Sequence, residues 1–527
     1  MKMYILKIIL SSIFIGVFFV SCNKDSDLNY KPNLALPLVK AKFTLRDILK
    51  KEANNNNIST DANGFIDLIF KTKIFSKTAE ELVPITNQNF VTVLKPTNSS
   101  LISIPPNTTL PTIQFNKTFS MNLGNGVFVD TITLKSGKLR VILNSSYDLN
   151  FNATIHLAGT NLIIPLARSG TPPLSIDTLI DISNQTISLD NSSSSNPNQV
   201  QVDISLTLKN ASNSQAVNAL NDSITMSLGF EDFRFKKLYG KFTDFVILSE
   251  PDTVPISIFE TALGLGSIKV DNPKLTTKFS NSFGVNVNAS FPMFIGYNEL
   301  ANPKTRIFSG VGIPSNINPL VVNGSSIIGQ SADTSFILNT LNSNIVDVIN
   351  MQPKKVIYQI KAIANTVNSS FILDTSKIDI DMEIDLPMSG TIDDFVFRDT
   401  IDYVFDKTKN IESVSLRSII TNGFPFKTFI QVYFANENNV VLDSLVKDKL
   451  DQIVIDAAPT NSSGVVNGPA AKQQSDLTIG AGVIPKLDLV KKFIVQARTS
   501  SYESKKIKIY DSYQMDISLG VKTKLNL

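Results

Sequence analysis

The sequence contains one cysteine, one histidine and no tryptophan in 527 residues. A single cysteine excludes an intramolecular disulfide, CxxC redox chemistry and cysteine-rich zinc sites. A single histidine, His156, excludes multi-histidine metal centres, and no G-x-S-x-G elbow accompanies it to suggest a catalytic triad. Walker A, dinucleotide-binding and HExxH motifs are absent as well. We therefore expect no catalytic residue, no metal site and no cofactor, and His156 is predicted to be a structural or surface histidine.

Charged residues are scarce too, at 18% of the chain, and the two signs nearly balance. Lys and Arg total 49 against 46 for Asp and Glu, which gives a formal net charge of +3. So small a net charge argues against nucleic acid as a partner. Hydrophobic residues make up 43% of the chain, enough to build packed cores, and the length allows three or four domains.

The first 21 residues have the composition of a secretion signal. Lys2 and Lys7 form a positively charged start, and residues 8–20 are an almost unbroken apolar stretch. This stretch is too short to cross the ~30 Å hydrocarbon core of a membrane comfortably, and polar chain follows it. We predict a cleaved signal over residues 1–21, whose loss leaves 47 basic against 46 acidic residues.

The only cysteine lies directly after this segment. The stretch Phe19-Val20-Ser21-Cys22 resembles a bacterial lipoprotein box. The resemblance implies that the Cys22 thiol is diacylated, that the signal is cleaved before it, and that the new N-terminus receives a further acyl chain such as palmitate. Several acyl chains, at ~0.8 kcal/mol per buried CH₂, would hold the protein firmly on a membrane. The alternatives are an ordinary signal peptide with a stray cysteine, or an N-terminal anchor helix.

A polar segment, residues 22–36, is predicted to be a lipidated tether. Within it Lys24, Asp25 and Asp27 resemble the surface-export signal of Bacteroidota lipoproteins, although Ser26 interrupts the acidic pair. The resemblance implies an outer-membrane lipoprotein whose body faces the cell exterior. A solvated tether without export function is the simpler alternative.

The rest of the chain predicts a mainly β fold of tandem antiparallel β-sandwich-like modules with a few short helices. Apolar and polar residues alternate with period two in runs that Asn, Ser, Thr and Pro clusters separate. The expected strands include residues 65–70, 138–141, 200–204, 378–386, 428–435, 440–446, 494–498, 506–510 and 513–525. Short helices are expected over about 44–52, 344–351 and 486–493.

Two segments of the middle of the chain share four motifs in the same order. The motifs begin at Gly137 and Gly266, at Leu149 and Val285, at Pro197 and Pro353, and at Gly240 and Gly390. We predict that residues 125–258 and 259–405 are related β modules that superpose with Asn152 on Asn288. They lie between an N-terminal β-rich region, 37–124, and a C-terminal β-rich domain, 406–527. Coincidental strand composition is the alternative.

One strand places four carboxylates on a single face, with Asp379, Asp381, Glu383 and Asp385 alternating with apolar residues. Such a row could bind a divalent cation or supply a glycosidase pair. The solvated face of an antiparallel strand is the favoured interpretation. Asp244 and Asp394, which match each other in the repeat, are expected to be turn positions.

Bacteroidota glycoproteins carry O-glycans on Ser or Thr directly after Asp, ahead of an aliphatic or similar residue. The matching positions in this sequence are Thr131, Thr178, Ser223, Thr253, Thr400 and Ser444. This resemblance implies possible O-glycosylation at these six sites, of which we expect at least two to be used.

These features favour a lipid-anchored outer-membrane or cell-surface lipoprotein with a non-enzymatic binding or structural role, accessory to an outer-membrane complex. Its expected partners are the membrane, through the N-terminal lipid, and an outer-membrane protein or a glycan. The alternative is an extracellular glycan-binding protein or a carboxylate-dependent polysaccharide hydrolase, although glycan platforms usually stack sugars on Trp or Tyr. Lipid carriage between two elongated β modules is a weaker alternative.

Overall fold

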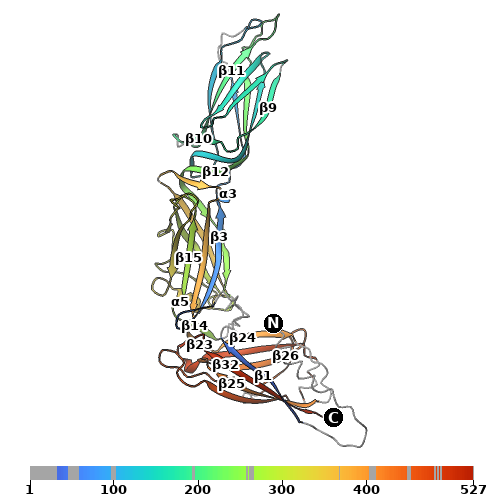
Figure 1. The fold of residues 1–527 in the computed structure, drawn as a ribbon, viewed down its shortest axis with the longest axis vertical. Helices are drawn as coiled ribbons and strands as arrows, with labels where there is room; N and C mark the ends of the chain where they lie inside the picture. The colour runs from blue at the N-terminus through green and yellow to red at the C-terminus, as the bar shows by residue number, and fades with distance from the viewer. Residues whose placement is uncertain are drawn as a thin grey trace, which may run out of the picture.

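The computed structural model describes residues 33–44, 58–95, 103–171, 173–192, 196–256, 259, 266–366, 368–402, 411–447, 453–479, 482, 486 and 489–525. Most of these residues lie in antiparallel β-sheets, which confirms the predicted mainly β fold of sandwich-like modules. The strands gather in three groups along the long axis of an extended molecule (Figure 1). We name these groups the distal, middle and basal modules.

The distal module has two facing layers of strands. One layer consists of β9 (Leu174–Asp181), β6 (Val127–Ser145), β12 (Ile224–Leu248) and β4 (Gln88–Leu94). The other consists of β5 (Ile113–Ser120), β11 (Gln199–Lys209), β7 (Asn150–Leu157) and β8 (Ile163–Arg168). The short strand β10 (Thr186–Asp190) pairs with β6 and with β11 and so joins the layers.

The middle module repeats this two-layer plan. One layer consists of β19 (Ala332–Leu338), β15 (Lys274–Asn281), β22 (Lys377–Pro387), β3 (Ile66–Thr78) and β2 (Ile58–Thr60). The other is built on β16 (Val287–Tyr297), β20 (Lys355–Asn365) and the end of β12, with the short strands β13 (Asp252–Pro255), β17 (Thr305–Ile307), β18 (Leu320–Val322) and β21 (Ser370–Leu373). Two short helices, α3 (Ala79–Leu82) and α5 (Ile345–Asn350), cap it.

The basal module contains both ends of the described chain. One layer consists of β1 (Asn33–Thr44), β32 (Gln514–Leu525), β25 (Ile411–Asn422) and β29 (Ala471–Ile479). The other consists of β24 (Phe395–Asp402), β30 (Lys492–Ser501), β26 (Phe426–Ala435), β27 (Val441–Ser444) and β28 (Ile453–Ile455). A small sheet of β14 (Ser267–Val270), β23 (Ser389–Asp393) and β31 (Ile507–Lys508) links the basal and middle modules.

The chain visits the modules in a nested order. It passes upward through β1, β3 and β4, and it returns downward through β12, β22 and β32. Each upward strand pairs antiparallel with the returning strand of its own module: β4 with β12, β3 with β22 and β1 with β32. Each module is thus closed by two strands that are far apart in the sequence.

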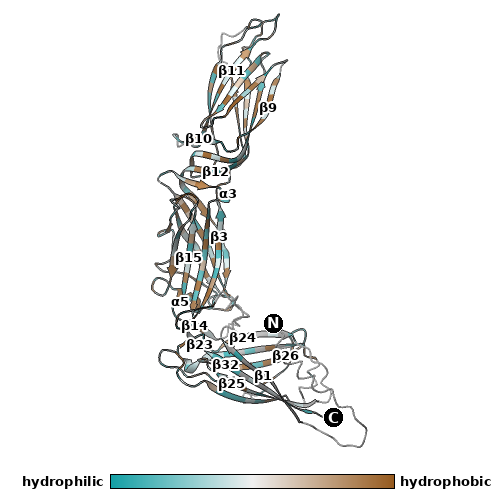
Figure 2. Cartoon of the chain, in the orientation of Figure 1, coloured by the Kyte–Doolittle hydropathy of each residue, from teal (hydrophilic) through white to brown (hydrophobic). Residues whose placement is uncertain are grey.

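The core follows from the alternation that the sequence predicted. In β11 every second residue is buried, and brown and teal residues alternate along the strands in Figure 2. Phenylalanine fills much of the interior, with Phe151, Phe230, Phe279 and Phe424 fully buried. Burying such a side chain stabilises the fold by roughly 1.5–3 kcal/mol relative to leaving it in water.

In each module, a turn that connects the two layers is built in a similar way. Asn281, the last residue of β15, donates from Nδ2 to the carbonyl oxygens of Val285 (3.0 Å) and Asn323 (3.1 Å), while its Oδ1 accepts from the Phe283 N–H (3.0 Å). In the basal module, Asn422 makes the corresponding three bonds, at 2.7–3.0 Å. In the distal module, Ser145 accepts from the backbone N–H two residues later, at 3.1 Å.

The matched positions of the predicted repeat have similar surroundings. A Cβ at Gly240 would lie 2.2 Å from the Phe128 carbonyl oxygen, and one at Gly390 would lie 1.8 Å from that of Lys269. Asp244 and Asp394, four residues later, both have a positive φ, of 54° and 47°. These likenesses support the relation between the two segments. The division at 125–258 and 259–405 and the superposition of the two modules stay predictions.

The described part of the chain contains one of the three predicted helices. The helix expected over 344–351 is α5, but the Asn344 side chain makes no cap bond to it and instead bonds the Ser309 N–H (2.8 Å) and the Ile307 carbonyl (2.9 Å). Residues 45–52 lie outside the described part of the chain. At the third position, strand β30 already begins at Lys492. Among the described residues, no helix has the length and apolarity needed to cross a membrane.

Candidate functional site

The predicted lipidation and export residues precede the described part of the chain. Cys22, Lys24, Asp25 and Asp27 lie outside the described residues, which begin at Asn33. Their roles stay predictions. The structure does fix where the tether leads, because Asn33 pairs with Lys524 in the basal module.

None of the six predicted O-glycosylation positions is buried. Thr253 in β13 and Thr400 in β24 are exposed, and Thr131, Thr178, Ser223 and Ser444 are half-buried. A glycosyltransferase needs an accessible hydroxyl, so exposure favours the first two. Glycosylation at all six stays a prediction.

Two of the aspartates before these positions, Asp177 and Asp443, already have structural partners. Asp177 binds Arg140 through two hydrogen bonds, at 2.9 and 2.7 Å. Asp443 accepts a hydrogen bond from Lys486 at 2.9 Å, and this contact lowers the pKa of Asp443 to about 2. Partial burial opposes the shift, whereas hydrogen bonds from Ser444 and Lys447 add to it. An Asp-Ser or Asp-Thr pair in a β protein can therefore serve the fold alone.

His156 lies on β7 and is partly exposed. Its Nδ1 is 3.6 Å from an Asp203 carboxylate oxygen on the neighbouring β11, and its Nε2 is 3.1 Å from the Thr160 carbonyl oxygen. Both ring nitrogens thus face groups of the same sandwich. This placement agrees with the predicted surface or structural histidine.

The acidic strand is β22, and its two neighbours supply lysines. Glu383 pairs with Lys71 of β3 at 2.8 Å. Asp385 lies 3.9 Å from Lys274 of β15, but burial, together with nearby Asp67, raises the pKa of Asp385. The carboxylates form a cross-strand charge ladder with lysines on both sides.

Asp379 departs from the expected solvated position. Only 10% of its side chain is exposed, because Lys73 (3.1 Å) and Lys377 (2.7 Å) cover it and the Ser76 hydroxyl donates to it at 2.7 Å. Burial raises the pKa of Asp379, but the hydrogen bonds from Lys377, Ser76 and Lys73 outweigh it and lower the pKa to about 2. A carboxylate held so firmly in its charged form is unsuited to act as a general acid.

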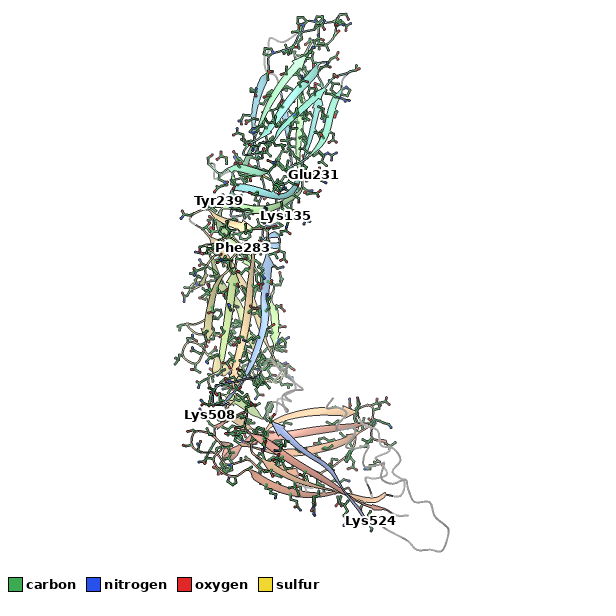
Figure 3. All side chains as sticks on the ribbon, in the orientation of Figure 1. Lys135, Glu231, Tyr239, Phe283, Lys508 and Lys524 are labelled. Carbon is green, nitrogen blue, oxygen red and sulfur yellow. The ribbon has the colours of Figure 1, made fainter. Side chains whose placement is uncertain are left out.

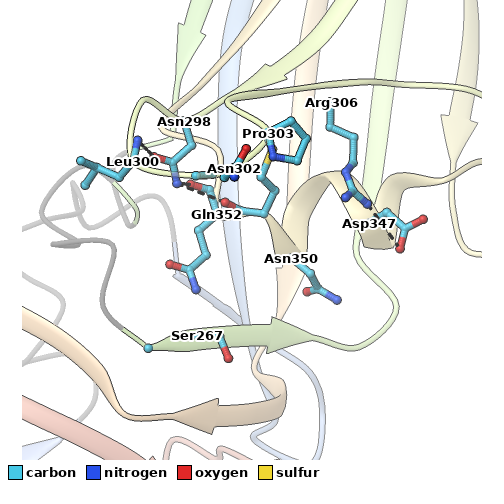
Figure 4. A pocket seen from close by; sticks show the side chains of 12 residues that line it. Ser267, Asn298, Leu300, Asn302, Pro303, Arg306, Asp347, Asn350 and Gln352 are labelled. Atoms are coloured by element: carbon cyan, nitrogen blue, oxygen red, sulfur yellow. Dashed lines mark hydrogen bonds and ion pairs between the residues drawn. The ribbon is translucent and has the colours of Figure 1, made fainter.

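A polar pocket lies at the lower end of the middle module, beside α5 and β14 (Figure 4). Its volume is about 370 Å³, within the range of small-molecule sites. Its walls come from the loop after β16, from β17, from the end of α5 and from β14. The lining includes Ser267, Asn298, Asn302, Arg306, Asp347, Asn350 and Gln352.

Hydrogen bonds hold these walls in place. Buried Asn298 donates to the carbonyl oxygens of Met351 (3.1 Å) and Gln352 (2.9 Å), which ties the loop after β16 to the end of α5. Asn350 accepts from the Val270 N–H at 2.9 Å and so fixes α5 against β14. The pocket is therefore preformed.

The polar groups of the pocket are suited to holding a ligand. Arg306 lies 3.9 Å from Asp347, too far for a direct hydrogen bond, and its side chain is 40% exposed. Amide groups and a guanidinium can hold a small polar or anionic molecule. The lining offers no nucleophile paired with a base, and the described residues contain no group of three or more metal ligands. No motif in the sequence indicates this pocket, because its residues meet only through the fold.

No family model matches the sequence, and no curated protein matches it. A candidate secreted protein from Parabacteroides distasonis is 14% identical, with 55% of this chain and 89% of that chain covered at a TM-score of 0.24. A triple jelly-roll protein of an archaeal virus is 8% identical (85% and 92% covered, TM-score 0.11), and so is the VP2 subviral particle of infectious bursal disease virus (84% and 82%, TM-score 0.14). At these scores the likenesses identify neither a family nor an activity.

Proposed function

We propose that the protein is an outer-membrane lipoprotein, anchored through acylated Cys22, that presents its distal module to the cell exterior in a non-enzymatic binding or structural role. The observation that carries the proposal is the position of β1. Asn33 lies 11 residues after Cys22, and such a stretch spans at most about 40 Å. The basal module would therefore stay near the membrane, with the distal module at the far end of the stack (Figure 1).

The long strands at the junction support a presenting role. β12 continues from the distal into the middle module, and it pairs with β6, β4, β20 and β21 along its 25 residues. Lys135 of the distal module also binds Asp374 of the middle module at 2.7 Å, and Figure 3 shows Lys135 near Tyr239 and Phe283 at this junction. Continuous backbone and cross-module contacts favour a stiff connection, as an accessory of an outer-membrane complex requires.

The polar pocket supports glycan binding as a second candidate function. Its amide-rich lining suits hydroxyl-bearing ligands, whereas the neutralised acidic strand argues against hydrolysis. A glycan array and a panel of chromogenic glycosides on the mature protein separate the two. Lipid carriage has less support, since two further cavities, lined largely by apolar residues, measure only about 50 and about 20 Å³.

Anchorage and orientation are tested on intact cells. Wild-type protein should fractionate with outer membranes and lose its distal module to protease added outside. Cys22→Ser should release an uncleaved or soluble species, because the acyl chains and not a helix hold the protein. The Lys24→Ala, Asp25→Ala, Asp27→Ala triple variant should keep the lipid but become protected from protease.

The outcomes separate the two halves of the proposal. Wild-type protein that stays with the outer membrane yet resists external protease would disprove surface exposure and leave the lipid anchor standing. Membrane association unchanged in Cys22→Ser would disprove the lipid anchor.

A further inference from the structure

Exposed aliphatic side chains are concentrated in one segment of the middle module. Residues 300–341 contain nine of the 20 large hydrophobic side chains that are exposed in the described part of the chain. Three of them are almost fully exposed: Ile317 (97%), Leu341 (93%) and Val311 (85%). We call the aliphatic strip the set Ile307, Val311, Ile317, Val321, Ile337 and Leu341. Exposed apolar surface of this kind marks interaction sites more often than chance placement.

The strip lies where the two layers of the middle module meet at one side. β17 and β18 pair with the outer edge of β16, and β19 pairs with the outer edge of β15 in the other layer. A bond from the Asn323 N–H to the Thr334 hydroxyl (3.3 Å) joins the two edges. These strands, with the loops that connect them, form one flank of the module, beside β15 (Figure 1).

The loops of this flank are fixed. Asn342 accepts from the Asn339 N–H (2.9 Å), donates to the Ile337 carbonyl oxygen (2.7 Å) and accepts at its own carbonyl from the Gly312 N–H (2.9 Å). These bonds hold Val311 and Leu341 beside each other and out in solvent. A preformed apolar surface loses little conformational entropy when a partner covers it.

The segment that carries the strip is also almost free of charge. Residues 300–341 contain only Lys304, Arg306 and Asp333 as charged residues. Depletion of charge is the compositional mark of interface cores, and a nearly neutral surface does not repel an identical copy of itself.

We propose that two copies of the chain associate side by side through the aliphatic strip. Copies that share the same short tether would hold their strips at the same height above the membrane. A twofold axis along the long axis of the molecule then brings each strip against its equivalent, and confinement to a membrane raises the effective concentration. The parallel arrangement rests on the proposed lipid anchor, whereas the association itself rests on the strip alone.

The first test uses soluble protein beginning at residue 23, which retains every described residue. Sedimentation equilibrium should detect a concentration-dependent dimer. The Val311→Asp, Leu341→Asp double variant should weaken dimerisation at least about tenfold, because it buries four carboxylates per dimer. A control, Ile163→Asp with Leu179→Asp, changes exposed aliphatic residues of the distal module and should leave the dimer unchanged.

The second test uses the same soluble form, which lacks cysteine, so that an introduced thiol is unique. A short bis-maleimide should cross-link Leu341→Cys into dimers and leave Ile163→Cys monomeric. Lipidated protein on vesicles, with an amine-reactive cross-linker, reports whether the association is parallel. Failure of the anchor would abolish only this last result.

Three results would overturn the proposal. One is a monomer at every concentration both in solution and on vesicles. Another is a dimer that the Asp variants leave intact. The third is cross-linking at residue 163 in place of residue 341.

Discussion

At the residue scale, the structure separates carboxylates that look alike in the sequence. Asp379 and Asp381 occupy alternate positions of β22, yet Asp379 is buried beneath two lysines while Asp381 is exposed. The period-two pattern predicts their common face but not their burial. Asp379 is covered by Lys377 of the same strand and by Lys73, which lies on the neighbouring strand β3. Burial was therefore a tertiary property.

This difference predicts an acid-sensitive middle module. The pKa of Asp379 is lowered to about 2 in the folded state, so its stabilising contribution is full above its unfolded pKa of about 3.9 and is lost as the pH falls through 2. Asp379→Asn should lower the urea midpoint of the middle module at pH 7, and its difference from wild type should shrink at pH 2.5. Asp381→Asn is the control and should change little at either pH. An equal effect of the two substitutions would contradict this account.

At the element scale, most strands and few connections were predictable. Alternation placed β22, β26 and β32 close to their observed bounds and identified only parts of the longer strands β3, β6 and β11. The sequence does not predict the turn at Asn281 and Asn422, since its pattern is only an Asn two residues before Phe. Long-range strand pairing is not predicted either, because local composition does not indicate that β3 pairs with β22 to close the middle module.

The shared turn predicts a large effect from a small substitution. Asn422→Ala would leave the Phe426 and Asp456 carbonyl oxygens and the Phe424 N–H without their bonds in a buried turn. We expect a loss of roughly 2–4 kcal/mol of unfolding free energy in the basal module. Asn461→Ala removes two similar but exposed turn bonds in the same module, from the Ser463 and Val465 N–H groups, and it should cost less than about 1 kcal/mol.

Hydrogen exchange in the basal module measures both substitutions on the same peptides. If Asn461→Ala proved as damaging as Asn422→Ala, burial of the turn would not be what makes Asn422 important.

At the scale of the whole molecule, the nested chain path sets which parts depend on which. The distal module is closed by β4 and β12 and contains neither end of the described chain, whereas the basal module needs both β1 and β32. β1 pairs with β32 from Asn33 to Thr44 and is an edge strand of its sheet. Its removal would leave β32 unpaired on one side without touching the strands of the other two modules.

Deleting residues 23–44 should therefore destabilise the basal module and leave the distal module unchanged. We expect amide protection in β32 and β25 to fall by at least about tenfold, because an edge strand that loses its neighbour opens locally at lower free energy. Protection in β7 and β11 should stay within about twofold of wild type, since the β4–β12 closure is intact. A control deletion of residues 23–32 alone should change neither region. If the longer deletion also removed protection from β11, the three modules would unfold as one cooperative unit. The stability of the distal module would then depend on the basal module.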